Sequence, residues 1–118
     1  MRILVADVVA AAAAVSGLRR SDLTGDDRHA VVTRVRLTAM AVAVRITGKS
    51  LPQVGAGFGG RDHSTVSHAV HVTAERVAAD AGVATLAQEI ERQAGIVACA
   101  RLARWQAVAG QIKSGATA

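Results

Sequence analysis

The sequence predicts an all-α fold, in which a small helical bundle is followed by an extra C-terminal amphipathic helical segment. Apolar residues make up 51% of the 118 residues, but the aromatic ones are only Phe58 and Trp105. A core must therefore be built mainly from alanine and aliphatic side chains, and alanine favours helices. Apolar side chains recur every three or four residues along most of the chain, which is typical of amphipathic helices. At this length we expect one domain with at most an appendage.

Two helices are expected in the N-terminal half of the chain. The first spans residues 3–15 and ends at Ser16-Gly17, and a polar turn, DLTGDD, follows at residues 22–27. The second helix runs from about Arg28 to Ile46, because apolar side chains recur there on one face. This apolar stripe consists of Val32, Val35, Ala39, Val42 and Ile46.

A shorter helix is expected over residues 51–58. Ser50 is a suitable N-cap, and Pro52 fits the first turn because its missing N–H is not needed there. The pair Gly59-Gly60 then permits a sharp reversal of the chain, since glycine accepts positive φ.

The helix after this turn begins among five successive polar residues, Arg61 to Thr65, with Asp62 or Ser64 as its cap. Together with the preceding helix it has the layout of a helix-turn-helix, whose second helix lies in the DNA major groove. Arginine suits guanine, a carboxylate accepts from the amino group of cytosine, and a hydroxyl or methyl group contacts thymine. Thr65 and His68 share a helix face that suits phosphate contacts. The alternative is that Asp62 merely caps the helix and that His63 is a surface residue without a role in DNA binding.

A further helical segment is expected over residues 83–113, as one long helix or as two, with Gly95 as the weak point. Its apolar side must be buried somewhere, so it folds back on the bundle, pairs with a second copy or docks another protein. We divide the chain into residues 1–80 and a C-terminal extension, residues 81–118. The residues expected to contact a partner or a second copy are Leu86, Ile90, Val97, Leu102, Trp105 and Ile112.

The charge favours a polyanion as partner, because the formal net charge is +5 and the isoelectric point is about 11. Seven basic and three acidic residues lie within residues 19–49, although a solvated helix face explains that cluster equally well. Cys99 is the single cysteine, and the four histidines have no nucleophile or third metal ligand beside them, so we expect no enzyme, metal or cofactor. The apolar start contains Asp7 and is too short for a membrane span, so we expect a cytoplasmic protein.

The stretch from Ser50 to Ala69 reads Ser-Leu-Pro-Gln-Val-Gly-Ala-Gly-Phe-Gly-Gly-Arg-Asp-His-Ser-Thr-Val-Ser-His-Ala. It resembles the C-terminal DNA-binding domain of the bacterial chromosomal replication initiator DnaA, whose pattern is Ser-Leu-Pro-x-Ile-Gly-x-x-Phe-Gly-Gly-Arg-Asp-His-Thr-Thr-Val-x-His-Ala. The similarity covers roughly residues 5–78. The run from Phe58 to Val66 is far more specific than a general helix-turn-helix pattern.

The resemblance implies roles for individual residues at a duplex box similar to TTATCCACA. Three side chains at the start of the second helix would read bases, with Arg61 beside them, and Arg28 matches an arginine that enters the minor groove. Hydroxyl, histidine and backbone groups would hold phosphates, and Arg45 is a further phosphate candidate. The DNA-contacting residues expected are Arg28, Arg45, Leu51, Pro52, Arg61, Asp62, His63, Ser64, Thr65 and His68.

The departures from the family pattern predict lower affinity or an altered preference. Ser64 replaces a threonine and lacks its methyl group, Asp26 and Asp27 stand in the basic loop, and Val44 stands where a lysine is common. The chain also lacks a Gly-x-x-x-x-Gly-Lys-[Ser/Thr] phosphate loop, so we expect a stand-alone DNA-binding protein without an ATPase module.

The expected function is sequence-specific binding of double-stranded DNA at initiator-box-like sites, in a bacterial, nucleoid-associated protein that modulates replication initiation or nearby transcription. The alternative is a protein-interaction adaptor that mimics the initiator domain and binds replication regulators. In that case the C-terminal segment would dock the partner.

Overall fold

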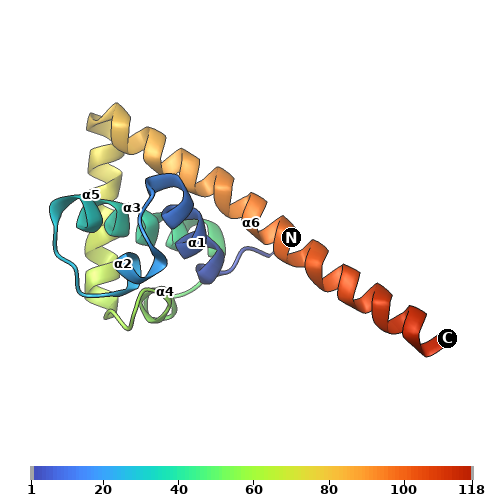
Figure 1. Ribbon diagram of the computed structural model, residues 1–118. Helices are drawn as coiled ribbons and strands as arrows, with labels where there is room; N and C mark the ends of the chain where they lie inside the picture. The colour runs from blue at the N-terminus through green and yellow to red at the C-terminus, as the bar shows by residue number, and fades with distance from the viewer. Residues whose placement is uncertain (1, 118) are drawn as a thin grey trace.

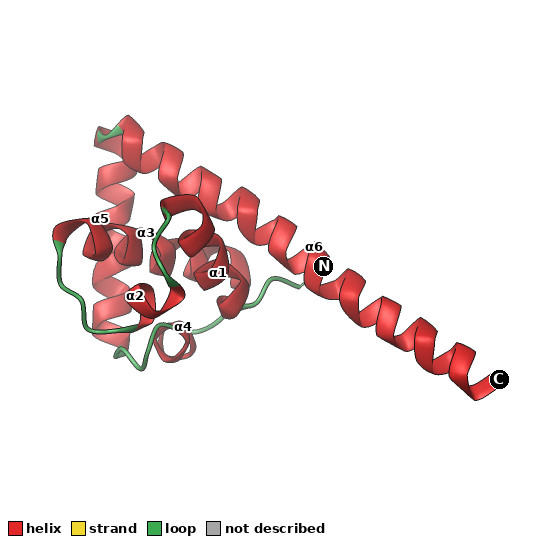
Figure 2. Cartoon of the chain, viewed as in Figure 1, coloured by secondary structure: helices red, strands yellow, loops and turns green. Residues whose placement is uncertain are grey.

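The chain forms six helices and no strand within residues 2–117, which are the residues that the computed structural model describes, with side chains up to residue 112 (Figure 2). The expected all-α bundle is therefore confirmed. In chain order the helices are α1 (Val5–Ser16), α2 (Arg20–Thr24), α3 (Ala30–Thr47), α4 (Leu51–Gly57), α5 (His63–Ala79) and α6 (Ala81–Thr117).

Helix α2 lies where a polar turn was expected, so the prediction for residues 22–27 was wrong in its first half. The backbone N–H of Arg19 donates to Asp22 Oδ2 at 2.9 Å, which caps the start of α2. Leu23 is completely buried and anchors the short helix in the core. A helix of five residues has no repeating apolar stripe, and its stability comes from tertiary packing.

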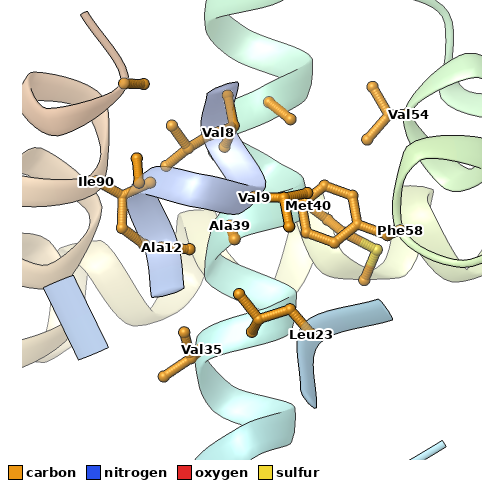
Figure 3. Close-up of a cluster of buried hydrophobic side chains, with 14 of the residues drawn as sticks. Val8, Val9, Ala12, Leu23, Val35, Ala39, Met40, Val54, Phe58 and Ile90 are labelled. Atoms are coloured by element: carbon orange, nitrogen blue, oxygen red, sulfur yellow. The ribbon is translucent and has the colours of Figure 1, made fainter. Parts of the chain in front are cut away.

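The core lies where α1, α3, α4 and α5 meet, and it is closed on one side by α6 (Figure 3). Phe58 is completely buried, as are Met40 of α3 and Ile90 of α6. Burial of each such large side chain contributes about 1.5–3 kcal/mol. The core is otherwise alanine, valine and leucine, as the composition predicted.

Helix α6 is one continuous helix, and Gly95 does not interrupt it. Its first half packs mainly on α1, and its second half projects beyond the bundle (Figure 1). Arg101 marks the end of the packed part, where its Nη2 atom lies 3.1 Å from Asp7 Oδ2 of α1. Among the described residues, no helix combines the length and the apolar character needed to cross a membrane.

The packing of α6 corrects the set of residues that was expected to contact a partner. Ile90 is completely buried in the core, and Leu86 packs against it. These two side chains are therefore part of the bundle. By contrast, Trp105 is 66% exposed and Ile112 is 67% exposed on the projecting half. The division of the chain at residue 80 stays a prediction.

Candidate nucleic-acid interface

The first helix of the helix-turn-helix is held by a reciprocal cap at its N-terminus. The backbone N–H of Gln53 donates to Ser50 Oγ at 3.3 Å, and the N–H of Ser50 donates to Gln53 Oε1 at 3.0 Å. This arrangement confirms Ser50 as the N-cap of α4. Leu51 is half-buried and Pro52 is exposed, so the start of α4 is accessible on the surface.

The turn between α4 and α5 depends on two glycines in left-handed conformation, as the sequence predicted. Gly59 has a φ of 87° and Gly60 a φ of 82°. Gly59 also passes close to α2, because a Cβ atom there would lie 1.9 Å from the carbonyl oxygen of Thr24. The turn is therefore packed against the end of α2, directly before the loop that carries Arg28.

Asp62 caps the recognition helix α5. Its Oδ1 atom accepts from the backbone N–H of Thr65 at 3.0 Å, from Thr65 Oγ1 at 2.9 Å and from Ser64 Oγ at 2.9 Å. These hydrogen bonds, the backbone one first, lower the pKa of Asp62 below its ordinary value. The carboxylate is therefore ionised at neutral pH. Because all three bonds fall on Oδ1, capping the helix does not use Oδ2.

The polar residues at the start of α5 lie on the surface rather than inside the bundle. Asp62, His63 and Ser64 are exposed, and Thr65 is half-buried. His68 is exposed one turn further along. The helix is anchored from its opposite side by Val66 and Ala69, which are completely buried. Side chains that read bases must be accessible in this way.

Arg61 is oriented differently from its polar neighbours. Its Nη2 atom donates to the carbonyl oxygen of Gly25 at 2.5 Å, and its Nη1 atom donates to the carbonyl oxygens of Phe58 and Thr24. Burial lowers the pKa of the guanidinium below its ordinary value. The side chain thus connects the turn before α5 to the loop after α2. The acceptors at Thr24 and Gly25 lie 37 and 36 residues away in the chain, so no local pattern indicates them.

A groove joins three of the predicted DNA-contacting residues that come from separate segments. This recognition groove has a volume of about 560 Å³, and its lining includes Arg28, Arg61 and Thr65. Arg28 is exposed on the loop between α2 and α3. The lining also includes Asp26, so one carboxylate stands among the basic groups.

Arg36 also lines the recognition groove, but its side chain is almost completely buried. It is only 5% exposed, and its Nε and Nη2 atoms donate to the carbonyl oxygens of Leu23 and Asp22 at 3.0 and 2.6 Å. Burial, and then the charge of Arg61, lowers the pKa of Arg36. Not every arginine of the basic stretch is therefore available to a polyanion.

The loop that carries Arg28 contains a histidine–aspartate pair. His29 Nδ1 lies 2.6 Å from Asp27 Oδ1, and the backbone N–H of His29 donates to the same oxygen at 2.9 Å. The hydrogen bond to Asp27, together with its negative charge, raises the pKa of His29 above 6.5. The charge of this loop therefore depends on pH.

Arg45 lies apart from the recognition groove. Its Nη1 atom is 3.5 Å from Glu91 Oε2, so it forms an exposed ion pair with α6. The other predicted residues lie on the turn, at the start of α4 or α5, or on the loop before α3.

Two crossed helices, an exposed polar start of the second helix and an arginine-bearing loop beside it define a DNA-binding helix-turn-helix protein. Residues 5–72 match the family described as "Bacterial dnaA protein helix-turn-helix". The chain belongs to this family.

Several similar proteins carry the name "Chromosomal replication initiator protein DnaA". One from Rhodopseudomonas palustris (strain BisA53) is 40% identical over 92 residues, which are 78% of this chain and 19% of that protein. One from Caulobacter vibrioides (strain NA1000 / CB15N) is 45% identical over 69 residues, or 58% of this chain and 14% of that protein. One from Nitrobacter hamburgensis is 42% identical over 90 residues, or 76% and 18%. The chain thus spans less than a fifth of the length of these relatives.

Proposed function

We propose that this protein binds duplex DNA at sites similar to the initiator box and thereby modulates replication initiation or nearby transcription. The observation that carries the proposal is the accessible polar start of α5 beside the recognition groove. The names of the similar proteins, which are replication initiators, support the biological setting. In this proposal the initiator-like region acts through DNA binding and performs no catalysis.

The proposed contacts follow the geometry of the site. Asp62, His63 and Ser64 enter the major groove and contact base edges, with Asp62 using the Oδ2 atom. Thr65 and His68 bind phosphates on one strand. Arg28 reaches into the adjacent minor groove from its loop.

The start of α4 provides a further phosphate contact, through the backbone near Leu51 and Pro52. For Arg61 we propose a positioning role, because its guanidinium is bonded to loop carbonyl oxygens. Arg45 contacts a phosphate only if it leaves Glu91, and surface ion pairs of this kind contribute little to stability.

Fluorescence anisotropy with two labelled duplexes tests the proposal. One duplex contains the TTATCCACA box and the other a scrambled box of equal composition. His63→Ala should lose about 1–3 kcal/mol of binding free energy on the box and little on the scrambled duplex. His71→Ala is the matched control, because this histidine is exposed on the same helix two turns later. Equal affinity of the unmodified protein for both duplexes would refute sequence-specific recognition.

A second candidate function, a protein-interaction adaptor, is favoured by the projecting half of α6. Leu102, Trp105 and Ile112 are exposed there, and exposed apolar stripes of this kind mark interaction surfaces. Beyond Glu91 the sequence contains four basic residues and no acidic residue. Two copies would bring like charges together, so the occupant we infer is an acidic amphipathic helix of another protein.

Trp105 is the only tryptophan, so its fluorescence reports binding at this stripe. Titration with an acidic amphipathic helical peptide should give a saturable change, whereas a peptide with the same apolar face and lysines in place of its acids should not. A chain that ends after Arg101 keeps the packed part of α6 and should bind the box normally. Self-association of the full chain, or equal responses to both peptides, would contradict this candidate.

A further inference from the structure

We propose that the DNA-binding surface continues past the recognition groove into a second groove, where Arg34 and Arg76 bind phosphates of the duplex that flanks the box. The inference rests on the proposed function, because it requires a duplex against the start of α5. Arg76 lies beyond residues 5–72, which match the family.

The second groove, which we call the flanking groove, adjoins the recognition groove. It has a volume of about 540 Å³, and its lining includes Arg34 of α3 with Arg76 and Asp80 near the end of α5. Arg28 and Thr33 line both grooves. A polyanion that reaches Arg28 is thus already at the entrance of the flanking groove.

The periodicity of α5 places Arg76 on the same face as the two phosphate-binding candidates. Thr65, His68, Val72 and Arg76 follow one another at spacings of three, four and four residues, which is one side of an α-helix. Arg76 is exposed, about 16 Å along the helix axis from Thr65. That distance corresponds to roughly five base pairs of duplex, so a phosphate on Arg76 belongs to DNA outside the contacts at Thr65.

The charge of the flanking groove also favours phosphate. Arg28, Arg34 and Arg76 face one carboxylate, Asp80, whose Oδ2 atom lies 2.8 Å from Arg34 Nη2. Both members of that ion pair are about half exposed, so a phosphate oxygen can replace the carboxylate on Arg34. Asp80 stays in place meanwhile, because its Oδ1 atom accepts from the backbone N–H of Gly82 at 2.8 Å.

The experiment compares three duplexes by fluorescence anisotropy over a range of salt concentrations: the box alone, and the box extended on one side or on the other by about one helical turn. Arg76→Ala should weaken binding several-fold on one extended duplex only, and should lower the salt slope there by about one. Arg92→Ala is the matched control, since Arg92 is an exposed arginine that pairs with Glu89 at 3.0 Å on α6. This control should leave all three affinities unchanged.

A variant that should strengthen DNA binding, rather than weaken it, tests the role of Arg34. Asp80→Asn keeps an oxygen acceptor for the start of α6 but removes the charge that faces Arg34. It should raise affinity for the same extended duplex by about threefold. A loss of affinity or no change would contradict this role.

The result separates the flanking contact from the specificity of the box. Phosphate contacts do not depend on sequence, so Arg76→Ala should still weaken binding to extended duplexes whose box is scrambled, but equally for both extensions, because no box then orients the protein. Loss of box preference with this effect intact would refute only the proposed function. Where the box is preferred, an equal loss on the box alone, a loss on both extended duplexes, or no loss would overturn the flanking groove. Inorganic phosphate at equal ionic strength should compete no better than chloride, whereas specific competition would identify a site for free anions instead.

Discussion

Arg61 donates from Nη2 to the carbonyl oxygen of Gly25 at 2.5 Å, and this bond joins the turn before the recognition helix to the loop that carries Arg28. The two segments are far apart in sequence but approach DNA together in the proposed complex. The half-buried guanidinium of Arg61 therefore holds the segment proposed to enter the major groove against the segment proposed to enter the minor groove.

Arg61→Ala should lower box affinity through the displaced loop rather than through a lost DNA contact. It also leaves carbonyl oxygens without their donor, which costs on the order of 1–3 kcal/mol of stability. In a double-mutant cycle with Arg28→Ala, the second substitution should cost little binding energy once the first is present. Binding losses that simply add would indicate instead that Arg61 contacts DNA directly.

The two turn glycines should differ in their sensitivity to substitution. Gly59→Ala and Gly60→Ala both place a side chain in left-handed conformation, which costs about 1–2 kcal/mol. Only Gly59→Ala also drives a Cβ atom into the carbonyl oxygen of Thr24, whereas no atom lies within 4 Å of the corresponding position at Gly60. Urea denaturation should therefore show a larger loss for Gly59→Ala. Equal losses would mean that the approach to α2 is not a constraint.

Removing only the cation of the ion pair between α6 and α1 should lower the stability of the protein. Asp7 is 4% exposed and accepts from Arg101 Nε at 3.2 Å and Nη2 at 3.1 Å. Arg101→Met leaves that carboxylate without its cation, and we expect a loss of about 2 kcal/mol because Arg101 is partly solvated. The double variant with Asp7→Asn should recover part of the loss in urea denaturation. Arg104→Met, an exposed arginine on the projecting half, should be neutral and serves as the control.

DNA affinity should depend on pH through His29. The hydrogen bond and charge of Asp27 raise the pKa of His29, so the imidazolium is favoured below this raised value and is lost as the pH rises through it. The loss removes a positive charge next to Arg28, so affinity should fall as the pH increases. Asp27→Asn should shift this transition to lower pH. The measurement is the difference in affinity between the unmodified protein and His29→Gln across the pH range, which isolates the contribution of His29.

The local features of the site were predictable from the sequence. Ser50 as a cap, the reversal at Gly59-Gly60 and the cap at the start of α5 depend on groups within three residues of each other. Helix α2 was not predictable in this way. It is anchored by the buried side chain of Leu23, and Arg36 donates to the carbonyl oxygens of Leu23 and Asp22 from 13 and 14 residues away.

The sequence also could not distinguish the packed half of α6 from the projecting half. Apolar residues recur evenly along both, so periodicity alone does not say which half is buried. Helix α1 has 12 residues and α6 has 37, which correspond to about 18 and 55 Å. Helix α6 is therefore longer than the surface that covers it, and its last turns project from the bundle.

The sequence by itself determined the helical class, the helix-turn-helix and the polar residues at the start of its second helix, because propensity, capping and glycine conformation act over a few residues. Only the tertiary structure decided that Arg36 and Arg61 bind carbonyl oxygens, that Arg45 pairs with Glu91, and that Arg28 lies between two grooves. An arginine side chain is long and flexible, and its partner is whichever acceptor the packed helices bring within reach.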